Sequence, residues 1–299
     1  MNSHLLPYPY NRPLARHIPG LKQLAKLLYS IHTSLNPPAP ASTHASPVRV
    51  VCISDTHNAT PDIPDGDLLI HAGDLTKQGS YEELHSQLSW LSGLPHTHKV
   101  VIAGNHDRLL DRATRNDEFS SLNLNWGDII YLENTSVTLT FDKSQKRNLK
   151  VYGSPLTPEY GIWAFQYPAI RDVWSRRIPD DTDIVVTHSP PALHLDAGKG
   201  GDGYLLRELQ RIKPVLAVFG HAHDGYGEDT LVHDGVQRAH DSILLQASGP
   251  VAIAQMLVWM AIAVVRRILP SPRATKLVNA ALAPGSRNKS SKSPIVLDI

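Results

Sequence analysis

The sequence predicts an α/β protein whose sheets are covered by helices. Seven short apolar runs begin at residue 48, and most of them are too uniformly apolar to have a solvent-exposed face. Helical patterns lie between these runs, and short polar clusters follow several of them. Buried strands that alternate with helices are typical of an α/β sandwich whose chemistry lies where the strands end.

The apolar runs are the predicted strands, and two intervening segments are predicted helices. Ser80 and Glu83 have the spacing of a capping box, and a leucine stripe at helical spacing follows them. A second helical pattern covers Tyr204–Ile212. The predicted strands are Val48–Ile53, Leu68–His71, Val100–Ala103, Ile129–Leu132, Leu149–Tyr152, Ile184–Thr187 and Val215–Phe219.

Residues 1–47 form a basic N-terminal tail that ends in a Pro-rich linker, and we separate them from a domain at residues 48–299. The first acidic residue is Asp55, whereas Lys22 and Lys26 lie on the polar side of an amphipathic helical pattern at 21–31. Three interpretations of such a segment (residues 14–31) remain open: an organelle presequence, a helix at a membrane surface, or a tail whose helix packs on the domain.

A hydrophobic segment interrupts the second half of the chain, at about 236–275. Residues 242–265 carry no charged side chain, and Ser248-Gly249-Pro250 is typical of a helix start. A helix over Val251–Val265 spans about 22 Å, which is shorter than the roughly 30 Å hydrocarbon core of a bilayer. We therefore expect residues 250–269 to form a buried helix or one that lies on a membrane surface.

The composition limits the possible functions of the protein and its possible cellular compartments. With 29 Lys and Arg against 28 Asp and Glu, the net charge of +1 excludes nucleic-acid binding that relies on bulk positive charge. The single cysteine, Cys52, excludes a disulfide framework and a metal site built from several cysteines. We expect an intracellular protein, most simply a cytoplasmic one, although residues 1–47 leave membrane association or organelle targeting open.

Five polar clusters follow strand-like runs, and together they predict a metal centre. Taken alone, each cluster is a weak signal, and a single Asp-x-His is more often a surface turn than a pair of ligands, but the ordered set is difficult to obtain by chance. Asp, Asn and His without thiolate suit divalent Mn, Fe, Zn, Ni or Mg. Seven candidate ligands are too many for one catalytic ion with an open position, and they fit two ions that share a carboxylate. The candidate ligands are Asp55, His57, Asp74, Asn105, His188, His221 and His223. Five further histidines are interpreted as surface residues: His85, His96, His98, His233 and His240.

The ordered set resembles the pattern of the calcineurin-like metallophosphoesterase superfamily, which runs D-x-H, G-D, G-N-H-D/E, H and G-H-x-H. All five blocks are present in order, and the resemblance extends from about Val48 to the C-terminus. The sequence is most similar to the small metallophosphoesterase-domain branch related to class III cyclic-nucleotide phosphodiesterases. The stretches that carry this likeness are IHAGDLT, VIAGNHD, VYGSPLTPEYG, VVTHSPP and VFGHAHDGYG.

The resemblance implies a four-layer α/β/β/α sandwich, to which the N-terminal segment and the hydrophobic helix would be additions. It also implies two divalent ions with distinct ligand sets. One ion would be held by Asp55, His57 and His223, the other by Asn105, His188 and His221, with Asp74 bridging them. His106 would lie near the substrate phosphate without binding metal, and Asn105 would contact the same phosphate.

These assignments predict a metal-dependent phosphoester hydrolase. Its nucleophile would be a hydroxide that bridges the metals, and His106 would be the general acid that protonates the leaving group. The alternative for His106 is a structural histidine behind the ligands. Either Asp107 or a backbone carbonyl is expected to orient its ring. Arg108 is a candidate phosphate contact, with a position on a helix surface as its alternative.

The prediction of the substrate depends on a residue pair that the sequence lacks. The protein Ser/Thr phosphatases of this superfamily carry an Asp-Arg pair after the Gly-Asp block, whereas residues 75–79 here read LTKQG. This difference favours a phosphodiesterase that acts on small nucleotide-like phosphodiesters. A phosphomonoesterase or protein phosphatase remains an alternative, as does a weakly active metal-binding scaffold that is recruited to a membrane or a partner.

Overall fold

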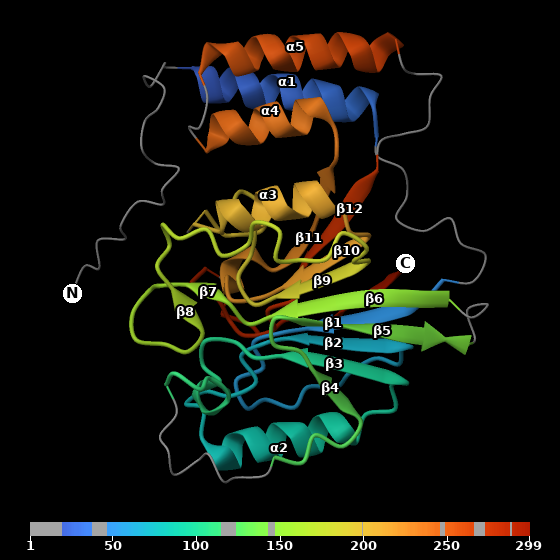
Figure 1. Ribbon diagram of the computed structural model, residues 1–299, viewed down its shortest axis with the longest axis vertical. Coiled ribbons are helices and arrows are strands. Elements are labelled where there is room, and N and C mark those ends of the chain that lie inside the picture. The colour runs from blue at the N-terminus through green and yellow to red at the C-terminus, as the bar shows by residue number, and fades with distance from the viewer. Residues whose placement is uncertain are drawn as a thin grey trace.

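The structure of the chain is a computed structural model (Figure 1). It describes residues 20–37, 47–114, 124–142, 147–198, 200–245, 249–265, 273–287 and 289–299. The described residues form two large sheets, a small two-stranded sheet and helices on the outer faces.

The first sheet has five strands in the order β13-β1-β2-β3-β4. Neighbouring strands run parallel from β1 to β4, while β13 pairs antiparallel with β1. Parallel pairing fits the continuous apolar runs of the sequence, because such strands are covered on both faces. The bounds are β1 Arg49–Ile53, β2 Leu68–Ala72, β3 His98–Ile102, β4 Ile129–Tyr131 and β13 Ile295–Asp298.

The second sheet has six strands in the order β11-β12-β10-β9-β6-β5. Its centre is parallel, and the outer strands β5 and β11 pair antiparallel with their neighbours. The bounds are β5 Thr135–Phe141, β6 Arg147–Ser154, β9 Ile184–Thr187, β10 Leu216–Phe219, β11 Gly227–Val232 and β12 Ala274–Asn279. A separate pair, β7 (Thr157–Pro158) and β8 (Gln166–Tyr167), forms the small sheet.

The two large sheets pack face to face, and one helix covers the outer face of each (Figure 1). Side chains alternate along β1, so Val50 and Cys52 enter the core between the sheets while Val51 and Ile53 face helix α2 (Tyr81–Ser92). Helix α3 (Gly203–Ile212) covers the second sheet in the same way. The predicted α/β/β/α sandwich is therefore confirmed.

Sequence signals explain where the two covering helices begin. Ser80 Oγ accepts a hydrogen bond from the Glu83 N–H at 3.2 Å, and the Glu83 carboxylate accepts from the Ser80 N–H at 3.3 Å. This is the predicted capping box. The side chain of Asp202 accepts from the N–H groups of Tyr204 and Leu205 at the start of α3.

Three further helices form a layer beyond α3: α1 (Leu21–Leu35), α4 (Gly235–Leu244) and α5 (Pro250–Val265) (Figure 1). Both α4 and α5 lie in the connection between the neighbouring strands β11 and β12. The Gln210 side chain on α3 donates to Asp241 on α4 at 2.8 Å. Helix α1 is attached to α4 by Tyr29, which donates to Gln237, and by His32, whose Nε2 lies 2.8 Å from Asp234.

The predicted strands and helices agree with the structure, but the predicted surface positions of two histidines do not. All seven predicted strands, both covering helices and the helical pattern at 21–31 are present. The prediction that His96 and His240 are surface residues is wrong, because both are buried. The His96 Nε2 lies 3.0 Å from the Pro64 carbonyl, and the His240 ring stacks on Tyr29 at 4.3 Å. An imidazole ring can enter a core when a nearby polar group satisfies its nitrogen.

The hydrophobic segment does form a helix, α5, which begins at the predicted Pro250. Residues 266–269 and 14–19 of the predicted segments lie outside the described residues. Among the helices that the structure describes, none is both long enough and apolar enough to cross a membrane. The domain boundaries, and the status of α5 as an insertion into the family fold, stay predictions.

Candidate metal centre

The candidate ligands follow five strands whose carboxyl ends meet at one edge of the sandwich. Parallel strands present such ends together, and this is where α/β sheets hold their ligands. The residues after each strand are Asp55 and His57 (β1), Asp74 (β2), Asn105 and His106 (β3), His188 (β9), and His221 and His223 (β10).

The loops that carry the ligands have an unusual backbone. Asp55, His57, Asp74 and His221 all adopt positive φ, at 53°, 45°, 55° and 62°. Left-handed residues other than glycine are uncommon, and they cluster at functional sites. Two backbone hydrogen bonds join the loops after β1 and β2, from the Asp55 N–H to the Gly73 carbonyl (2.9 Å) and from the His57 N–H to the Asp74 carbonyl (3.1 Å).

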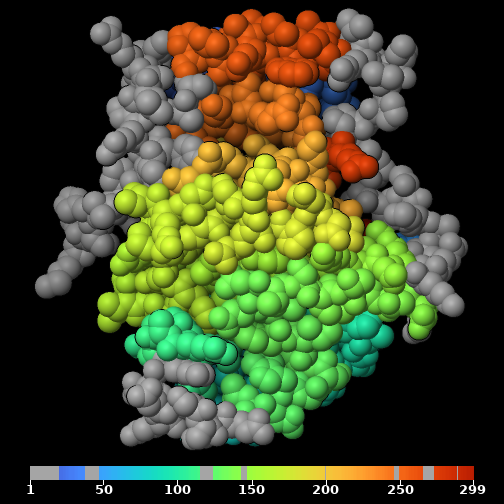
Figure 2. All heavy atoms as spheres, in the orientation of Figure 1, coloured from blue at the N-terminus to red at the C-terminus, as the bar shows by residue number. Residues whose placement is uncertain are grey.

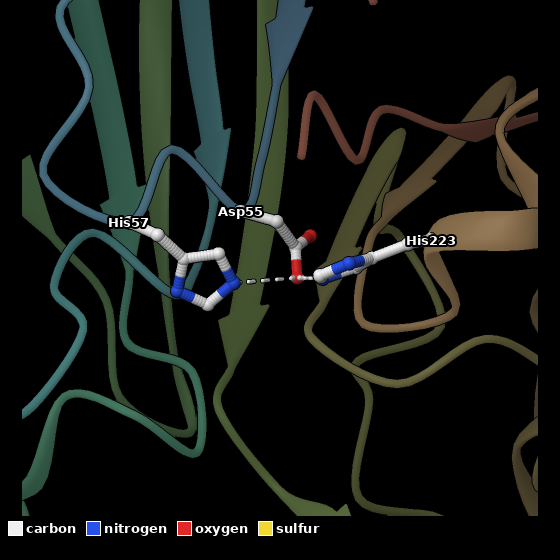
Figure 3. A group of neighbouring side chains, drawn as sticks. All are labelled: Asp55, His57 and His223. Carbon is white, nitrogen blue, oxygen red and sulfur yellow. Dashed lines mark hydrogen bonds and ion pairs between the residues drawn. The ribbon is translucent and has the colours of Figure 1, made fainter. Parts of the chain in front are cut away.

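Asp55, His57 and His223 form the first group of converging side chains. Figure 3 shows the Asp55 carboxylate between the two imidazole rings. Its Oδ1 lies 3.0 Å from the Nε2 of His223 and 4.0 Å from the Nε2 of His57. The Asp55 side chain is fully buried, so its charge must be balanced inside the site.

Asp74 lies beside this group and faces histidines with both of its oxygens. Its Oδ2 is 3.8 Å from the Nε2 of His57, and its Oδ1 is 3.4 Å from the Nε2 of His188. The same His188 Nε2 lies 3.1 Å from the Oδ1 of Asn105. The ring of His221 packs edge-on against His188, with centroids 5.1 Å apart. All seven predicted ligands thus gather in one site.

The donor atoms fit a centre for divalent cations. Metal–nitrogen and metal–oxygen bonds are about 2.1 Å long, so two donors on one ion lie no more than about 4.2 Å apart. The Asp–His separations of 3.0 to 4.0 Å satisfy this limit. Within the described part of the chain, three overlapping groups keep their ligand atoms within 4.8 Å: Asp55–His57–His223, Asp55–Asp74–His188 and His57–Asp74–His106.

The imidazoles are also oriented as metal ligands require. A ligating histidine normally donates its second ring N–H to a carbonyl or carboxylate, which fixes the tautomer and leaves the other nitrogen free to bind. Here three Nδ1 atoms face backbone carbonyls, and the Nε2 atoms face the carboxylates. The pairs are His57 with Thr76 at 3.1 Å, His188 with Ala72 at 2.9 Å and His223 with Pro284 at 3.0 Å.

The electrostatics of the site favour added positive charge. Burial opposes ionisation of Asp55 and Asp74, but hydrogen bonding and attraction to neighbouring histidines outweigh it and hold the pKa of both carboxyls below the ordinary range. These histidines are mainly His223 and His188 for Asp55, and His188 and His57 for Asp74. Burial lowers the pKa of His188, yet the two aspartates raise it to about 9. Burial and the neighbouring His188 lower the pKa of His221 to about 4. Two buried carboxylates therefore attract a cation, and the neutral His221 offers a lone pair.

Two glycines make room for the carboxylates. A Cβ at Gly220 would lie 2.1 Å from Asp55 Oδ2, and a Cβ at Gly104 would lie 2.2 Å from Asp74 Oδ1. Neither position can carry a side chain without displacing a candidate ligand. The close approach of the two carboxylates therefore explains why a glycine precedes both His221 and Asn105.

His106 is held at the rim of the same site by backbone groups. Its Nδ1 lies 2.7 Å from the Lys77 carbonyl, and its N–H donates to Asp74 Oδ1 at 2.8 Å. Of the two expected orienting partners, the structure has the carbonyl and not Asp107. The His106 ring meets His57 edge-on, with centroids 4.7 Å apart, and its Nε2 is the ring nitrogen not engaged by the carbonyl.

Asp107 instead connects two of the ligand loops through hydrogen bonds. Its buried carboxylate accepts hydrogen bonds from the Thr76 N–H (2.9 Å), the Thr76 hydroxyl (2.7 Å), the Leu75 N–H (3.2 Å) and the Gly104 N–H (2.8 Å). These bonds connect the loop after β2 to the loop after β3, which carry Asp74 and Asn105.

We expect Asp107→Ala to destabilise the protein by about 3 kcal/mol, because several buried donors lose a charged acceptor. The free energy of unfolding in urea measures this change. Asp65→Ala, at an exposed carboxylate, is the matched control and should alter stability by less than about 0.5 kcal/mol. An Asp107→Ala variant as stable as the control would contradict the fastening role.

Sequence reasoning missed two aromatic residues beside the site. They come from the β7–β8 connection: Trp163 packs on His106 with ring centroids 4.2 Å apart, and Tyr160 meets His221 at 5.9 Å. The stretch VYGSPLTPEYG points to this segment, but no spacing rule indicated that the aromatic rings reach the metal centre. Arg108 lies two residues after His106, at the start of a short helical turn, Arg108–Leu110. The Arg108 side chain is exposed.

Lys292 is a third residue near the site that the sequence did not indicate. Its ammonium donates to the carbonyls of His223 (2.6 Å) and Ala283 (2.7 Å). This contact ties the C-terminal segment to the loop that carries His223.

Comparison with protein families settles the class to which this constellation belongs. The model of the calcineurin-like phosphoesterase family matches residues 48–225, which include every candidate ligand. The chain belongs to the calcineurin-like phosphoesterase family. It is therefore a hydrolase that acts on phosphoesters and depends on divalent metal, and its Asp and His side chains supply groups that can bind such an ion.

Three other proteins are similar to parts of this chain. Metallophosphoesterase domain-containing protein 1 of Homo sapiens is 35% identical over 227 residues, covering 66% of this chain and 67% of that protein. A UPF0046 protein of Caenorhabditis elegans is 39% identical over 201 residues, covering 61% of this chain and 71% of the relative. A protein of Emericella nidulans named probable rhamnogalacturonate lyase C is 44% identical over 255 residues. That match covers 84% of this chain but only 24% of the relative.

Proposed function

We propose that this phosphoesterase is a phosphodiesterase for small nucleotide-like phosphodiesters, with Asp55, His57 and His223 around one divalent ion, Asn105, His188 and His221 around a second, and Asp74 between them. The observation that carries the two-ion arrangement is the position of Asp74, whose oxygens face His57 and His188 separately. Divalent cations held by these residues would neutralise charge on the phosphate and lower the pKa of water, which would make a hydroxide nucleophile available near neutral pH.

His106 is the general acid of the proposed reaction. The Lys77 carbonyl accepts from its Nδ1–H, and Trp163 packs against the ring, so the Nε2 is held toward the site. From there it can donate a proton to the alkoxide that leaves when the phosphorus–oxygen bond breaks.

Two features support a diester as the substrate. One is in the sequence: residues 75–79 after Asp74 read LTKQG and lack the Asp-Arg pair that the protein Ser/Thr phosphatases of this superfamily carry. The rings of Tyr160 and Trp163 border the site and offer flat apolar surface of the kind on which nucleobases stack, at about 1–3 kcal/mol per base. Arg108 remains a proposed phosphate contact.

The experiment compares bis(p-nitrophenyl) phosphate with p-nitrophenyl phosphate in the presence of Mn²⁺, together with 2′,3′- and 3′,5′-cyclic nucleotides. We expect a higher kcat/KM for the diester than for the monoester, and turnover of at least one cyclic nucleotide. Faster hydrolysis of the monoester would instead support a phosphomonoesterase. Metal analysis of the native protein in the same preparation gives the number and identity of the ions.

A further inference from the structure

Glu83, in the first turn of α2, accepts more hydrogen bonds than the start of a helix requires. In a capping box the acidic residue accepts from the N–H of the N-cap residue, here Ser80. The Glu83 Oε2 accepts this bond at 3.3 Å. It also accepts two shorter bonds from N–H groups that precede the helix, at 2.9 Å from Gln78 and 3.0 Å from Gly79. The carboxylate therefore holds the turn at 77–80 as well as the helix.

The second oxygen of Glu83 reaches the loop after β1. Its Oε1 accepts a hydrogen bond from the side-chain amide of Asn58 at 2.6 Å, and the Asn58 Oδ1 accepts from the Lys77 N–H at 3.2 Å. Burial opposes ionisation of Glu83, but the hydrogen bonds from Asn58 and from the backbone hold its pKa below the ordinary range. A charged carboxylate thus joins the loop after β1, the turn at 77–80 and the start of α2.

The turn that Glu83 holds is also the turn that orients His106. The Lys77 carbonyl lies 2.7 Å from the Nδ1 of His106. The hydrogen bond that one ring nitrogen makes fixes the tautomer of an imidazole and the direction of its other nitrogen. A displaced Lys77 carbonyl would therefore turn the Nε2 of His106 away from the leaving group.

The same turn lies directly against the backbone around His106. A Cβ at Gly79 would lie 2.5 Å from the backbone nitrogen of Arg108 and 2.7 Å from the carbonyl oxygen of His106. The Thr76 hydroxyl donates to that carbonyl at 3.3 Å. Because the two segments leave no space between them at this point, a displaced turn would disturb His106 through its backbone as well as through its ring.

The position of His106 explains why it needs this support. Its ring is half-buried at the rim of the site, and residues 111–114, which follow shortly after it, lie at the molecular surface, in teal-green in Figure 2. A catalytic side chain keeps one orientation only when packing and supporting hydrogen bonds lock it there. At a rim, where packing is less complete than in the core, the hydrogen bonds carry more of that task.

We propose that Glu83 is a positioning residue for the general acid. Its carboxylate fixes the turn at 77–80, and the Lys77 carbonyl of that turn holds the Nε2 of His106 toward the leaving group. This inference rests on the proposed role of His106 as the acid. Among the described residues, Glu83 lies outside the three groups of converging ligand atoms, so it acts through the turn and not on the substrate.

The test separates this role from helix capping. Glu83→Ala removes every hydrogen bond that the carboxylate accepts, whereas Glu83→Gln keeps the size of the side chain and one acceptor oxygen, so it also serves if the alanine variant fails to fold. The matched control is Ser80→Ala. It removes the other half of the same capping box, the bond from the Glu83 N–H at 3.2 Å, and leaves the carboxylate in place. Urea unfolding, circular dichroism and metal content are measured on each full-length variant.

These variants and His106→Gln are assayed with Mn²⁺ on aryl phosphodiesters whose leaving groups range from p-nitrophenolate to phenolate, and on a 2′,3′-cyclic nucleotide, whose leaving group is an alkoxide. A misdirected imidazole loses part of the about 10²–10⁴-fold that a positioned acid contributes. We therefore expect Glu83→Ala to lower kcat by about 10- to 100-fold for the alkoxide and by less than about threefold for p-nitrophenolate, with KM unchanged. Phenolate should lie between them, and Glu83→Gln should show the same order with smaller losses.

The control should lose stability without this dependence on the leaving group. We expect Ser80→Ala to unfold at lower urea but to keep kcat within about threefold of the wild type on every substrate. Glu83 variants that lose activity equally on all leaving groups, or that match Ser80→Ala, would overturn the inference. A fall in their metal content would also overturn it, because the carboxylate would then support the ligands and not the acid.

His106→Gln in the same assay distinguishes failure of this inference from failure of the proposed reaction. If its loss depends on the leaving group and the losses of the Glu83 variants do not, the acid assignment stands and only the role of Glu83 is refuted. If His106→Gln loses activity equally on every substrate, the acid assignment fails, and the positioning role of Glu83 fails with it.

Discussion

Asp74→Asn is expected to reduce kcat/KM by about 1,000-fold or more, and to lower the metal content of the purified protein. Asp74 is buried, and its two oxygens face His57 and His188. Asn keeps the size of the side chain and an acceptor for the His106 N–H, but it removes the negative charge that would hold two cations together. Loss of several kcal/mol of charge stabilisation corresponds to about three decades in rate.

The matched control for this substitution is Asp65→Asn, which removes the same charge from an exposed carboxylate. Activity on bis(p-nitrophenyl) phosphate and metal content by elemental analysis are measured on both variants. An Asp74→Asn protein that retains full metal content and activity within about tenfold of the wild type would refute the bridging role. If a cellular effect of the protein persists in this variant without turnover, the scaffold alternative explains the effect better.

His106→Gln is the second prediction, and its effect should depend on the leaving group. Proton donation by a positioned side chain contributes about 10²–10⁴-fold, so hydrolysis of a nucleoside diester should fall by that factor. A p-nitrophenolate leaving group needs little protonation, and the loss with bis(p-nitrophenyl) phosphate should be much smaller. Gln preserves a polar side chain of similar length and can still approach the Lys77 carbonyl.

The ratio of the two losses distinguishes acid catalysis from a structural role. His85→Gln, on the exposed side of α2, is the control for the substitution itself. A structural histidine would lower both activities equally, because it would disturb the ligand geometry for every substrate. Equal losses would therefore exclude His106 as the acid, and leave it as a group that positions Asp74.

The sequence reveals the central strands because they are buried on both faces. In β9 (Ile184–Thr187), for example, residues 184–186 are all apolar, as expected of a strand that is covered on both faces. The outer strand β5 is half exposed and alternates with threonines, and β11 carries Glu228 and Asp229, so neither forms such a run. Helix α4 was also missed. It contains three buried polar residues that contact other helices: Gln237 and His240 meet Tyr29 of α1, and Asp241 accepts from Gln210 of α3. Such tertiary pairing leaves no local pattern in the sequence.

The candidate site, like the fold, could be predicted from the sequence only in part. Each candidate ligand follows an apolar run, so strand ends and residue type together indicate it before any coordinates exist. The groups that orient these ligands are backbone carbonyls, among them those of Ala72 and Pro284. Every residue has such a carbonyl, so its role depends only on where the chain passes. Trp163 and Tyr160 approach the centre through a loop conformation, which short-range patterns do not encode.

The strand order of the first sheet determines when the metal centre can assemble during synthesis. Asp55 and His57 follow β1, yet β1 pairs on one side with β13, through Arg49 and Asp298. β12 fills the place between β10 and β11, and the Pro284 carbonyl orients His223. A nascent chain on the ribosome therefore exposes its first ligands while their structural neighbours are still untranslated. Such long-range pairing slows folding, so we expect the full ligand arrangement to form only after residues 274–298 are translated.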